Sequence, residues 1–464
     1  MPQRRTLITG GTVFDSLTGT LSRQDILVED GTIREVAPSI TADAVERVDA
    51  TGKWITPGFI DMHVHMTVIG MESLPCYLGT GVTTVRDLGG DAARLKQMAL
   101  DVEMGKVAGP EVIFSGPLLQ QVGATNFGAD HRGGGPGARP IADEASAAAA
   151  VNALIDYGAK SLKIYTSVQE HIAAAILKAA EGRVPVTAHL GATSSTFVLE
   201  RGIGGLEHVQ PTVIMDISPP NWQEELRRGS TGPKVAQAWA DVDLNGPEMA
   251  SWLRLFLDRK AFLCPTVTVT AARPPADDAR LGLVPLTLAA ALEARAAATA
   301  AGSAGGGGGR GPGGGAPLAS EEQINRARNN QRGFMAALNA AGGDMVIGTD
   351  VQAGRLPGYG FHSEMAAFQG RGIKPVDILK AATSVAARHL WRDDLGVVAA
   401  GRRADLVILD KDPTADIANA GSITHVMKAG SLYEAAKLTA IAEPDTAKFF
   451  PAEPVPADRG QSRL

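Results

Sequence analysis

The sequence predicts an α/β protein, a (β/α)8 TIM barrel joined to a small β-sandwich domain that both chain ends build. Between about residues 55 and 352, short apolar runs alternate with Ala-rich stretches of helical character. Strands that alternate with helices form parallel sheets through right-handed βαβ units. Both chain ends instead contain short β-rich pieces divided by Gly, Asp and Ser turns. No glycine fingerprint follows the first strand, which disfavours a doubly wound nucleotide-binding sheet.

The apolar runs number eight, which is the strand count of such a barrel. In chain order they are ITPGFIDMHVHM, VTTVRDLG, EVIFSGPLL, SLKIYTS, PVTAHLG, GGLEHV, AFLCPTVTV and DMVIGTDV.

The same patterns set the predicted domain limits. The segment 302–316, GSAGGGGGRGPGGGA, has no side chains able to pack, so we expect a mobile loop there. Beyond it, Ser320 with Gln323 predicts a capping box that opens a helix to about Ala341. The predicted units are 1–55 with 391–440 for the composite β-domain, 56–390 for the barrel, 210–260 and 270–340 for its insertions, and 441–464 for a C-terminal tail.

Composition and charge exclude several classes of protein. The 464 residues include 44 Lys and Arg against 50 Asp and Glu, a net charge of −6. This mild acidity disfavours nucleic-acid or anionic-membrane partners. The two cysteines, Cys76 and Cys264, cannot form a disulfide framework. No run of 18 apolar residues occurs, and no apolar segment follows the N-terminal arginines, so we expect a cytoplasmic enzyme without a membrane anchor.

Four of the nine histidines and one aspartate lie at the ends of predicted barrel strands. His63 and His65 are two residues apart, so a strand projects both from one face. His189 ends the fifth strand, His208 the sixth and Asp350 the last. Singly, each histidine could be structural and Asp350 could cap a turn. Together they stand on the active face of the fold, and imidazole with carboxylate suits Zn2+ or a similar divalent ion.

Lys163 lies in an apolar strand, SLKIYTS, where an unpaired charge is costly. A carboxylated lysine amine could bridge two cations with its two anionic oxygens. Alternatively, the ammonium could form an ion pair with Asp87 or Asp350. Both interpretations stay open on these residues alone.

The order of these motifs resembles that of the amidohydrolase superfamily. PGFIDMHVH, GVTTVRDLGG, KIYTS, TAHLGA, LEHVQ and GTD follow the family order, and TSVAARHLWRDDLGVVAAGRRADLVILDKDP resembles its return to the β-sandwich. The resemblance covers roughly residues 5–435. It implies that CO2 carbamylates Lys163 and that this side chain bridges two divalent metals, commonly Zn2+. It also implies that one metal, the more buried, is bound by His63, His65 and Asp350, and the other by His189 and His208.

Within the superfamily, VTTVRDLGG, LKIYTS and the HLGA and LEHV pair resemble the imidazolonepropionase-related and metal-dependent prolidase/carboxypeptidase branch. Imidazolonepropionase is typically mononuclear and lacks the bridging lysine, so Lys163 favours the dipeptidase-like relatives. These include hydrolases of N-acyl amino acids and of ochratoxin-like amides, and they often form homo-oligomers. The loop LLQQVGATNFGADHRGGG lacks the Gly-Gly-His-Gly pattern common in those peptidases, which puts their substrates in doubt here.

The expected reaction is hydrolysis of an amide C–N bond in a dipeptide, an N-acyl amino acid or a similar carboxylate-bearing small molecule. A metal-bridging hydroxide would attack, because bound metals acidify water. Asp350 would be the general base and return its proton to the leaving amine. Lys163, His189 and His208 complete the expected catalytic set.

Four further residues are candidate substrate contacts. Tyr165 shares the inward face of Lys163, although it could simply pack there. His131 and Arg132 follow the third strand, where Arg132 could grip a carboxylate or remain a solvated loop residue. His362 follows the eighth strand and could line the pocket or cap a helix.

Two other functions are consistent with the same motifs. One is a mononuclear cyclic amidase or deaminase of the imidazolonepropionase type. The other is a catalytically inactive amidohydrolase scaffold that acts as an assembly protein. Metal content separates them from a binuclear hydrolase.

Overall fold

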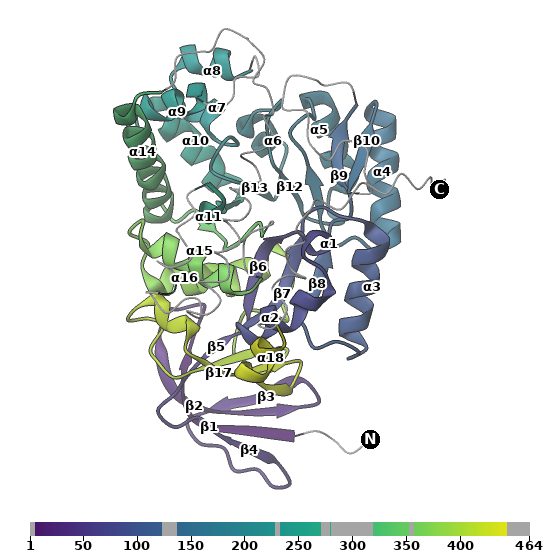
Figure 1. Ribbon diagram of the computed structural model, residues 1–464, viewed down its shortest axis with the longest axis vertical. Helices are drawn as coiled ribbons and strands as arrows, with labels where there is room; N and C mark the ends of the chain where they lie inside the picture. Colours follow the sequence, from purple (N-terminus) through teal and green to yellow (C-terminus); the bar gives the residue numbers. More distant parts are fainter. Residues whose placement is uncertain are drawn as a thin grey trace, which may run out of the picture.

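The computed structural model of the chain is a mixed α/β fold with parallel strands at its centre (Figure 1). It describes residues 5–122, 137–227, 233–270, 279, 319–351 and 357–442. The parallel strands form a three-stranded and a seven-stranded sheet, in the order β6-β7-β8 and β10-β9-β11-β12-β13-β14-β15. Their bounds are β6 Phe59–Val64, β7 Val82–Asp87, β8 Glu111–Phe114, β9 Leu118–Gln121, β10 Ala138–Ile141, β11 Leu162–Ile164, β12 Val186–Ala188, β13 Gly205–Glu207, β14 Phe262–Cys264 and β15 Asp344–Met345.

Backbone hydrogen bonds join these two sheets at both sides. Beyond β15, Ile347 O accepts the N–H of Met62 in β6 over 2.9 Å. Before β11, Lys160 N–H donates to Phe114 O at the end of β8 over 3.0 Å. The α/β class and the parallel strands predicted from the sequence are therefore confirmed. Closure into an eight-stranded barrel requires hydrogen bonds between the two sheets on both sides. The closed barrel stays a prediction.

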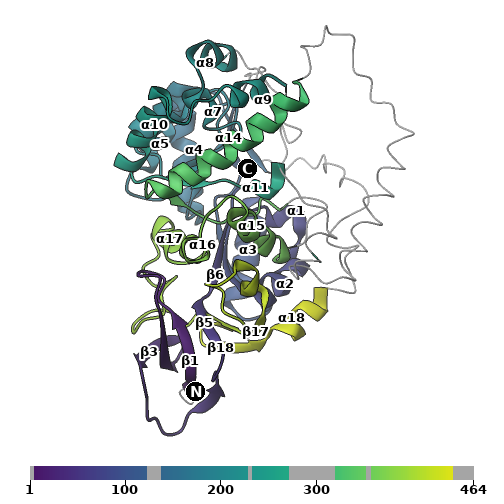
Figure 2. The same ribbon diagram turned by 90° about the vertical axis from the view of Figure 1, so that its left-hand side faces the viewer.

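Helices follow the parallel strands along the chain (Figures 1 and 2). Asp143 caps the start of α4 by accepting the Ser146 N–H over 2.7 Å. Gly158, with φ of 116°, ends the helix. The predicted Ser320 and Gln323 capping box opens α14, which runs alongside α9 in Figure 2. The helices are α1 Met66–Ile69, η1 Met71–Ser73, α2 Leu74–Gly79, α3 Ala92–Glu103, α4 Glu144–Tyr157, α5 Glu170–Ala180, α6 Ser195–Glu200, α7 Ile214–Ile217, α8 Pro220–Arg227, α9 Pro233–Ala240, α10 Pro247–Asp258, α11 Val267–Thr270, α14 Glu321–Ala340, α15 Tyr359–Gln369, α16 Pro375–Ala381, α17 Ser384–His389, η2 Ile417–Gly421 and α18 Ala435–Ala442.

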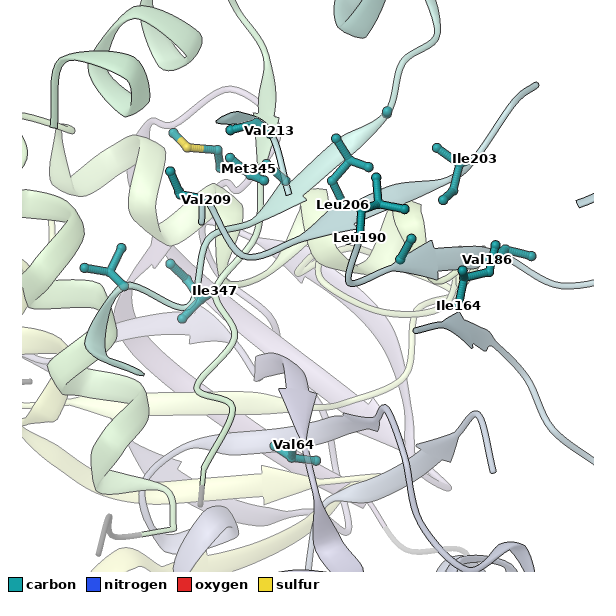
Figure 3. Close-up of a cluster of buried hydrophobic side chains, with 14 of the residues drawn as sticks. Val64, Ile164, Val186, Leu190, Ile203, Leu206, Val209, Val213, Met345 and Ile347 are labelled. Atoms are coloured by element: carbon teal, nitrogen blue, oxygen red, sulfur yellow. The ribbon is translucent and has the colours of Figure 1, made fainter. Parts of the chain in front are cut away.

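Aliphatic side chains of the parallel strands form the main core (Figure 3). Ile164, Leu206 and Ile347 have no exposed surface. Because strand side chains alternate between faces, the neighbours of these aliphatic residues point the opposite way. On β11, for example, Lys163 lies between Leu162 and Ile164. The packing of the aliphatic face thus fixes the direction of the polar residues on the other face.

Both chain ends contribute to one further sheet of eight strands, at the lower end of Figure 1. Its order is β18-β17-β16-β5-β1-β2-β3, with β4 beside β1. The two ends meet where β5 pairs antiparallel with β16. The bounds are β1 Arg5–Phe14, β2 Leu21–Glu29, β3 Thr32–Ala37, β4 Glu46–Asp49, β5 Trp54–Pro57, β16 Leu406–Leu409, β17 Ile423–Lys428 and β18 Ser431–Glu434. A sandwich and the exact domain limits stay predictions.

Some predicted features lie outside the described residues, among them the Gly-rich segment 302–316 and most of the tail 441–464. Within the described ranges, no helix combines the length and the apolar character that crossing a bilayer requires.

A network of ion pairs connects the parallel strands to the composite sheet. Glu111, which begins β8, accepts hydrogen bonds from Arg392 and Arg403. Arg403 also pairs with Asp405 next to β16, and Lys428 of β17 lies 3.2 Å from the same carboxylate. Burial alone would raise the pKa of Glu111, but the two guanidinium groups lower it below its usual value.

The substitution Glu111→Gln should therefore destabilise the protein in a pH-dependent way. A carboxyl group with a lowered folded pKa stabilises the protein above its unfolded pKa of about 4.3, and this contribution disappears as the pH falls. We expect a loss of about 2 kcal/mol in the free energy of unfolding at pH 7, measured by urea denaturation. The loss should shrink at pH 3.5. Glu35→Gln, at an exposed position on β3, is the control and should change little, and equal losses for Glu111→Gln at both pH values would contradict this account.

Candidate metal centre

The four histidines predicted at strand ends form one contiguous cluster. The ring centroids of His63 and His65, both from the end of β6, are 5.4 Å apart. His208, after β13, lies 5.0 Å from His63 and 4.3 Å from His189, which follows β12. Three separate strands therefore bring these imidazoles together.

Asp350 and Lys163 adjoin the same cluster. The Asp350 Oδ1 atom lies 3.1 Å from His65 Nε2 and 3.7 Å from His63 Nε2. The Lys163 Nζ atom lies 2.9 Å from His63 Nε2. One ligand atom each from His63, His208 and Asp350 lies within 4.8 Å of the others. This spacing allows the three side chains to reach a single cation.

The backbone at this end of the strands adopts an uncommon conformation. His208, Thr266 and Asp350 all have positive φ, of 65°, 45° and 45°. Such angles cost non-glycine residues about 1–3 kcal/mol and often mark functional sites. At His208 the positive φ breaks the strand alternation, so both Glu207 and His208 approach His63. His208 Nδ1 is further held 2.6 Å from Thr266 Oγ1.

A buried carboxylate, Asp61, fixes β6 against the segment that leads to Asp350. It accepts the N–H of His63 over 3.2 Å and both the N–H and the hydroxyl of Thr349 over 3.0 and 2.8 Å. The Asp350 N–H donates to His63 O over 2.7 Å. Burial raises the pKa of Asp61 to about 7. Backbone and side-chain hydrogen bonds thus join the segment after β15 to β6.

The protonation states suit a divalent cation. Burial lowers the pKa of His63 to about 4 and that of His208 to about 3, and it lowers the pKa of His189 well below its usual value. Neutral imidazole is the form that binds metals. Burial would raise the pKa of Asp350, but His63 and His65 hold it well below the usual range. Neutral nitrogen and anionic oxygen donors together fit Zn2+ or a related ion.

Lys163 is buried at 2% exposure. Burial lowers the pKa of its ammonium group, although Glu207 and Asp350 oppose this shift. Asp87, a partner considered from the sequence, instead accepts the N–H groups of Met66 and Gly89 over 2.5 and 3.0 Å. The close contact of Lys163 Nζ is His63, in the middle of the histidine cluster.

Sequence reasoning missed Glu207. This fully buried carboxylate lies 2.8 Å from His63 Nδ1 and accepts a hydrogen bond from Arg86 Nη2 over 2.6 Å. Strand alternation places Glu207 and His208 on opposite faces, so the pattern hid the carboxylate. The signal that could have found it is a charged residue within a short apolar strand, GLEH. Arg86 itself forms a buried ion pair with this carboxylate.

The candidate substrate contacts lie in different places. The Tyr165 ring centroid is 5.2 Å from that of His189, so it borders the cluster. His362 instead packs against Phe59 at the start of β6, and its Nε2 lies 2.9 Å from Thr80 O. The structure does not bring His362 to the histidines that end β6. The other two candidates lie outside the described residues: His131 and Arg132.

Comparison with known proteins finds a family match in the C-terminal part of the chain. A family model described as "Amidohydrolase family" matches residues 315–433. A dihydroorotase of Pelotomaculum thermopropionicum is 40% identical over 75 residues, which is 16% of this chain and 18% of the dihydroorotase. The chain thus matches less than a fifth of that relative's length. The resemblance to amidohydrolases inferred from the sequence is confirmed.

The fold of solved amidohydrolases extends over nearly the whole chain. A bottromycin amidohydrolase structure aligns with a TM-score of 0.69 at 22% identity, covering 97% of this chain and 92% of the other. The structure of a Xaa-Pro dipeptidase with bound methionine aligns with a TM-score of 0.64 at 18% identity, covering 93% and 100%. At these identities the likeness concerns the fold.

The bonds around Asp61 predict a specific stability loss. Thr349→Val keeps the side-chain shape but removes the hydroxyl that donates to Asp61. We expect the free energy of unfolding to fall by about 2 kcal/mol, because a hydrogen bond to a carboxylate contributes about 1.5–3 kcal/mol. The matched control is Thr187→Val on β12, whose buried hydroxyl has no partner among the described residues. If chemical denaturation gave both variants the same stability, the role of Asp61 as an anchor would be wrong.

Proposed function

We propose that this protein is a metal-dependent hydrolase that cleaves an amide C–N bond in a small molecule. The observation that carries the proposal is the buried group of His63, His208 and Asp350, whose ligand atoms lie within 4.8 Å of one another. The family of the C-terminal segment and the fold of the whole chain support it. The sequence matches cover only part of the chain, so we propose the activity for the chain as a whole.

The proposed centre holds two divalent ions, and Zn2+ is the first candidate because the ligands are imidazole and carboxylate. His63, His65 and Asp350 would hold one ion, and His189 and His208 the other. When bound, such ions acidify a water molecule and polarise a substrate carbonyl.

Lys163 is the proposed bridge between the two ions. Its burial favours the uncharged amine, which can add CO2. In that reaction the Nζ lone pair forms the N–C bond as one C–O π bond of CO2 breaks, and one N–H proton passes to solvent. The product is a carbamate whose single negative charge is shared by two oxygens. The side chain would thereby change from a neutral amine to an anion in a site rich in ligand atoms.

Asp350 is the proposed general base. Its carboxylate is ionised and lies beside the imidazoles, so it can accept a proton from the attacking water. The same proton can then pass to the amine nitrogen as the C–N bond breaks. Tyr165, next to His189, is placed to contact the substrate.

For the substrate we favour a dipeptide or an N-acyl amino acid, within the prolidase/carboxypeptidase-like branch. The likeness in fold to a structure named as a Xaa-Pro dipeptidase supports this class. His131 and Arg132 remain proposed contacts for a substrate carboxylate, since arginine binds carboxylates through two parallel hydrogen bonds. We further propose that the protein acts in the cytoplasm as a homo-oligomer.

Metal analysis tests the centre directly. We expect purified protein to bind about two equivalents of Zn2+ per chain and to lose activity after dialysis against a chelator. Lys163→Ala should retain one equivalent or fewer, and reloading of the wild type should depend on added bicarbonate. The control is Lys428→Ala, which removes a partly buried lysine that pairs with Asp405 of the composite sheet. Two equivalents and full activity in Lys163→Ala would exclude the bridging role.

A substrate panel tests the reaction. Xaa-Pro and other dipeptides, N-acyl amino acids, lactams and lactones should be compared with the wild type and with Asp350→Asn. We expect hydrolysis of dipeptides or N-acyl amino acids, and a fall in kcat of about 10²–10⁴-fold in the variant because the general base is lost. Turnover of lactams alone by a protein with one metal would favour the mononuclear cyclic amidase. A folded, metal-free, inactive protein would favour the assembly scaffold.

A further inference from the structure

We propose that Glu207 is a positioning residue that fixes the tautomer and orientation of His63, with Arg86 as its clamp. The inference rests on the proposed metal centre and adds two residues to it. Neither residue is among the proposed metal ligands, so their burial beside the histidine cluster calls for a separate explanation.

The three side chains form a single buried chain of contacts. Arg86, Glu207 and His63 each have 0% exposure. Arg86 Nη2 donates to Glu207 Oε1 over 2.6 Å, and Glu207 Oε2 lies 2.8 Å from His63 Nδ1. Each carboxylate oxygen therefore has its own partner.

This arrangement determines which ring nitrogen carries the proton. A carboxylate paired with a guanidinium group is an acceptor only, so His63 Nδ1 must donate to it. A neutral His63 then has its lone pair on Nε2. That nitrogen faces Lys163 Nζ at 2.9 Å and Asp350 Oδ1 at 3.7 Å, within the proposed ligand set. A carboxylate behind a metal-binding histidine orients the ring in this way in many metal sites.

Arg86 anchors the carboxylate to the strand that carries the histidine. Its Nε donates to Met62 O over 2.7 Å, one residue before His63. Its guanidinium carbon lies 5.2 Å from the centre of the Phe262 ring on β14. Desolvation offsets much of the attraction within a buried ion pair, so such a pair adds little net stability. The ion pair between Arg86 and Glu207 therefore acts mainly by fixing the geometry at His63 rather than by stabilising the fold.

A second set of possible ligand atoms, those of His63, Glu207 and Cys264, overlaps this chain. We assign it to the support of His63. Both Glu207 oxygens already have partners, and a guanidinium cation beside them opposes a further cation. Burial also raises the pKa of the Cys264 thiol well above its usual value, away from the thiolate that binds metals.

The main test is metal affinity in Glu207→Gln, measured by competition with a chelating indicator for Zn2+. We expect affinity to fall about 10- to 100-fold, the usual effect of losing such a partner. The matched control is Glu364→Gln. Glu364 is also fully buried, but its oxygens accept the N–H groups of Val267 and Thr268 over 2.6 and 2.8 Å. Its loss should lower stability and leave Zn2+ affinity within about twofold of the wild type.

A second measurement does not depend on Glu207→Gln. Magic-angle-spinning NMR of metal-free wild type, labelled with ¹⁵N-histidine and assigned with His63→Asn, reports which nitrogen of His63 is protonated. We expect Nδ1–H. A proton on Nε2 would overturn the inference, as would unchanged Zn2+ affinity in folded Glu207→Gln. A strong thiolate-to-metal absorption band in the Co2+-loaded wild type would also overturn it, because it would place a metal at Cys264.

These outcomes separate this inference from the proposed function. If the wild type binds no metal, the proposed function fails, and the NMR measurement still tests the tautomer. If the wild type binds two equivalents and Glu207→Gln binds them equally well, only the positioning role fails.

Discussion

An imidazole side chain offers two nitrogens in one plane, and at His63 the surroundings fix the direction of both. Nδ1 faces Glu207 from β13, while Nε2 faces Lys163 from β11. The backbone of the same residue donates to Asp61 and accepts from Asp350. A single buried residue thus sets the relative positions of β6, β11, β13 and the segment after β15, and the remaining ligand candidates take their places around it.

The second constraint on the site is charge. Arg86 is a buried cation and Lys163 a buried amine, and Glu207 and Asp350 are buried carboxylates in contact with the same histidine. In a low-dielectric interior such groups persist only when they compensate one another. The proposed carbamylation would change Lys163 from a neutral amine to an anion, and divalent cations would balance the added negative charge.

The candidate ligands that the structure brings together follow simple periodicity in the sequence. His63 and His65 share a strand face, and His189 and Asp350 end apolar runs, so each could be found from spacing. Glu207 was missed because the positive φ of His208 reverses the alternation there, and backbone angles of this kind are not written in a pattern. His362 lies beside Phe59 at the start of β6, because proximity to the last strand in sequence does not say which end of β6 the following helix approaches. In the fold, the apolar runs gave the parallel strands, whereas the pairing of β5 with β16 depends on contacts between distant segments.

That pairing has a consequence for how the protein is made. The chain reaches Leu406, the first residue of β16, about 350 residues after it leaves β5 at Pro57. At synthesis rates of about 5–20 residues per second, β5 waits on the order of 20–70 s for its antiparallel partner. During that interval its hydrogen-bonding edge is open, and unpaired edges are where nascent chains associate wrongly. The composite sheet is thus the last part of the fold that can close, and a ribosome-bound chain is most exposed to aggregation or chaperone capture along β5.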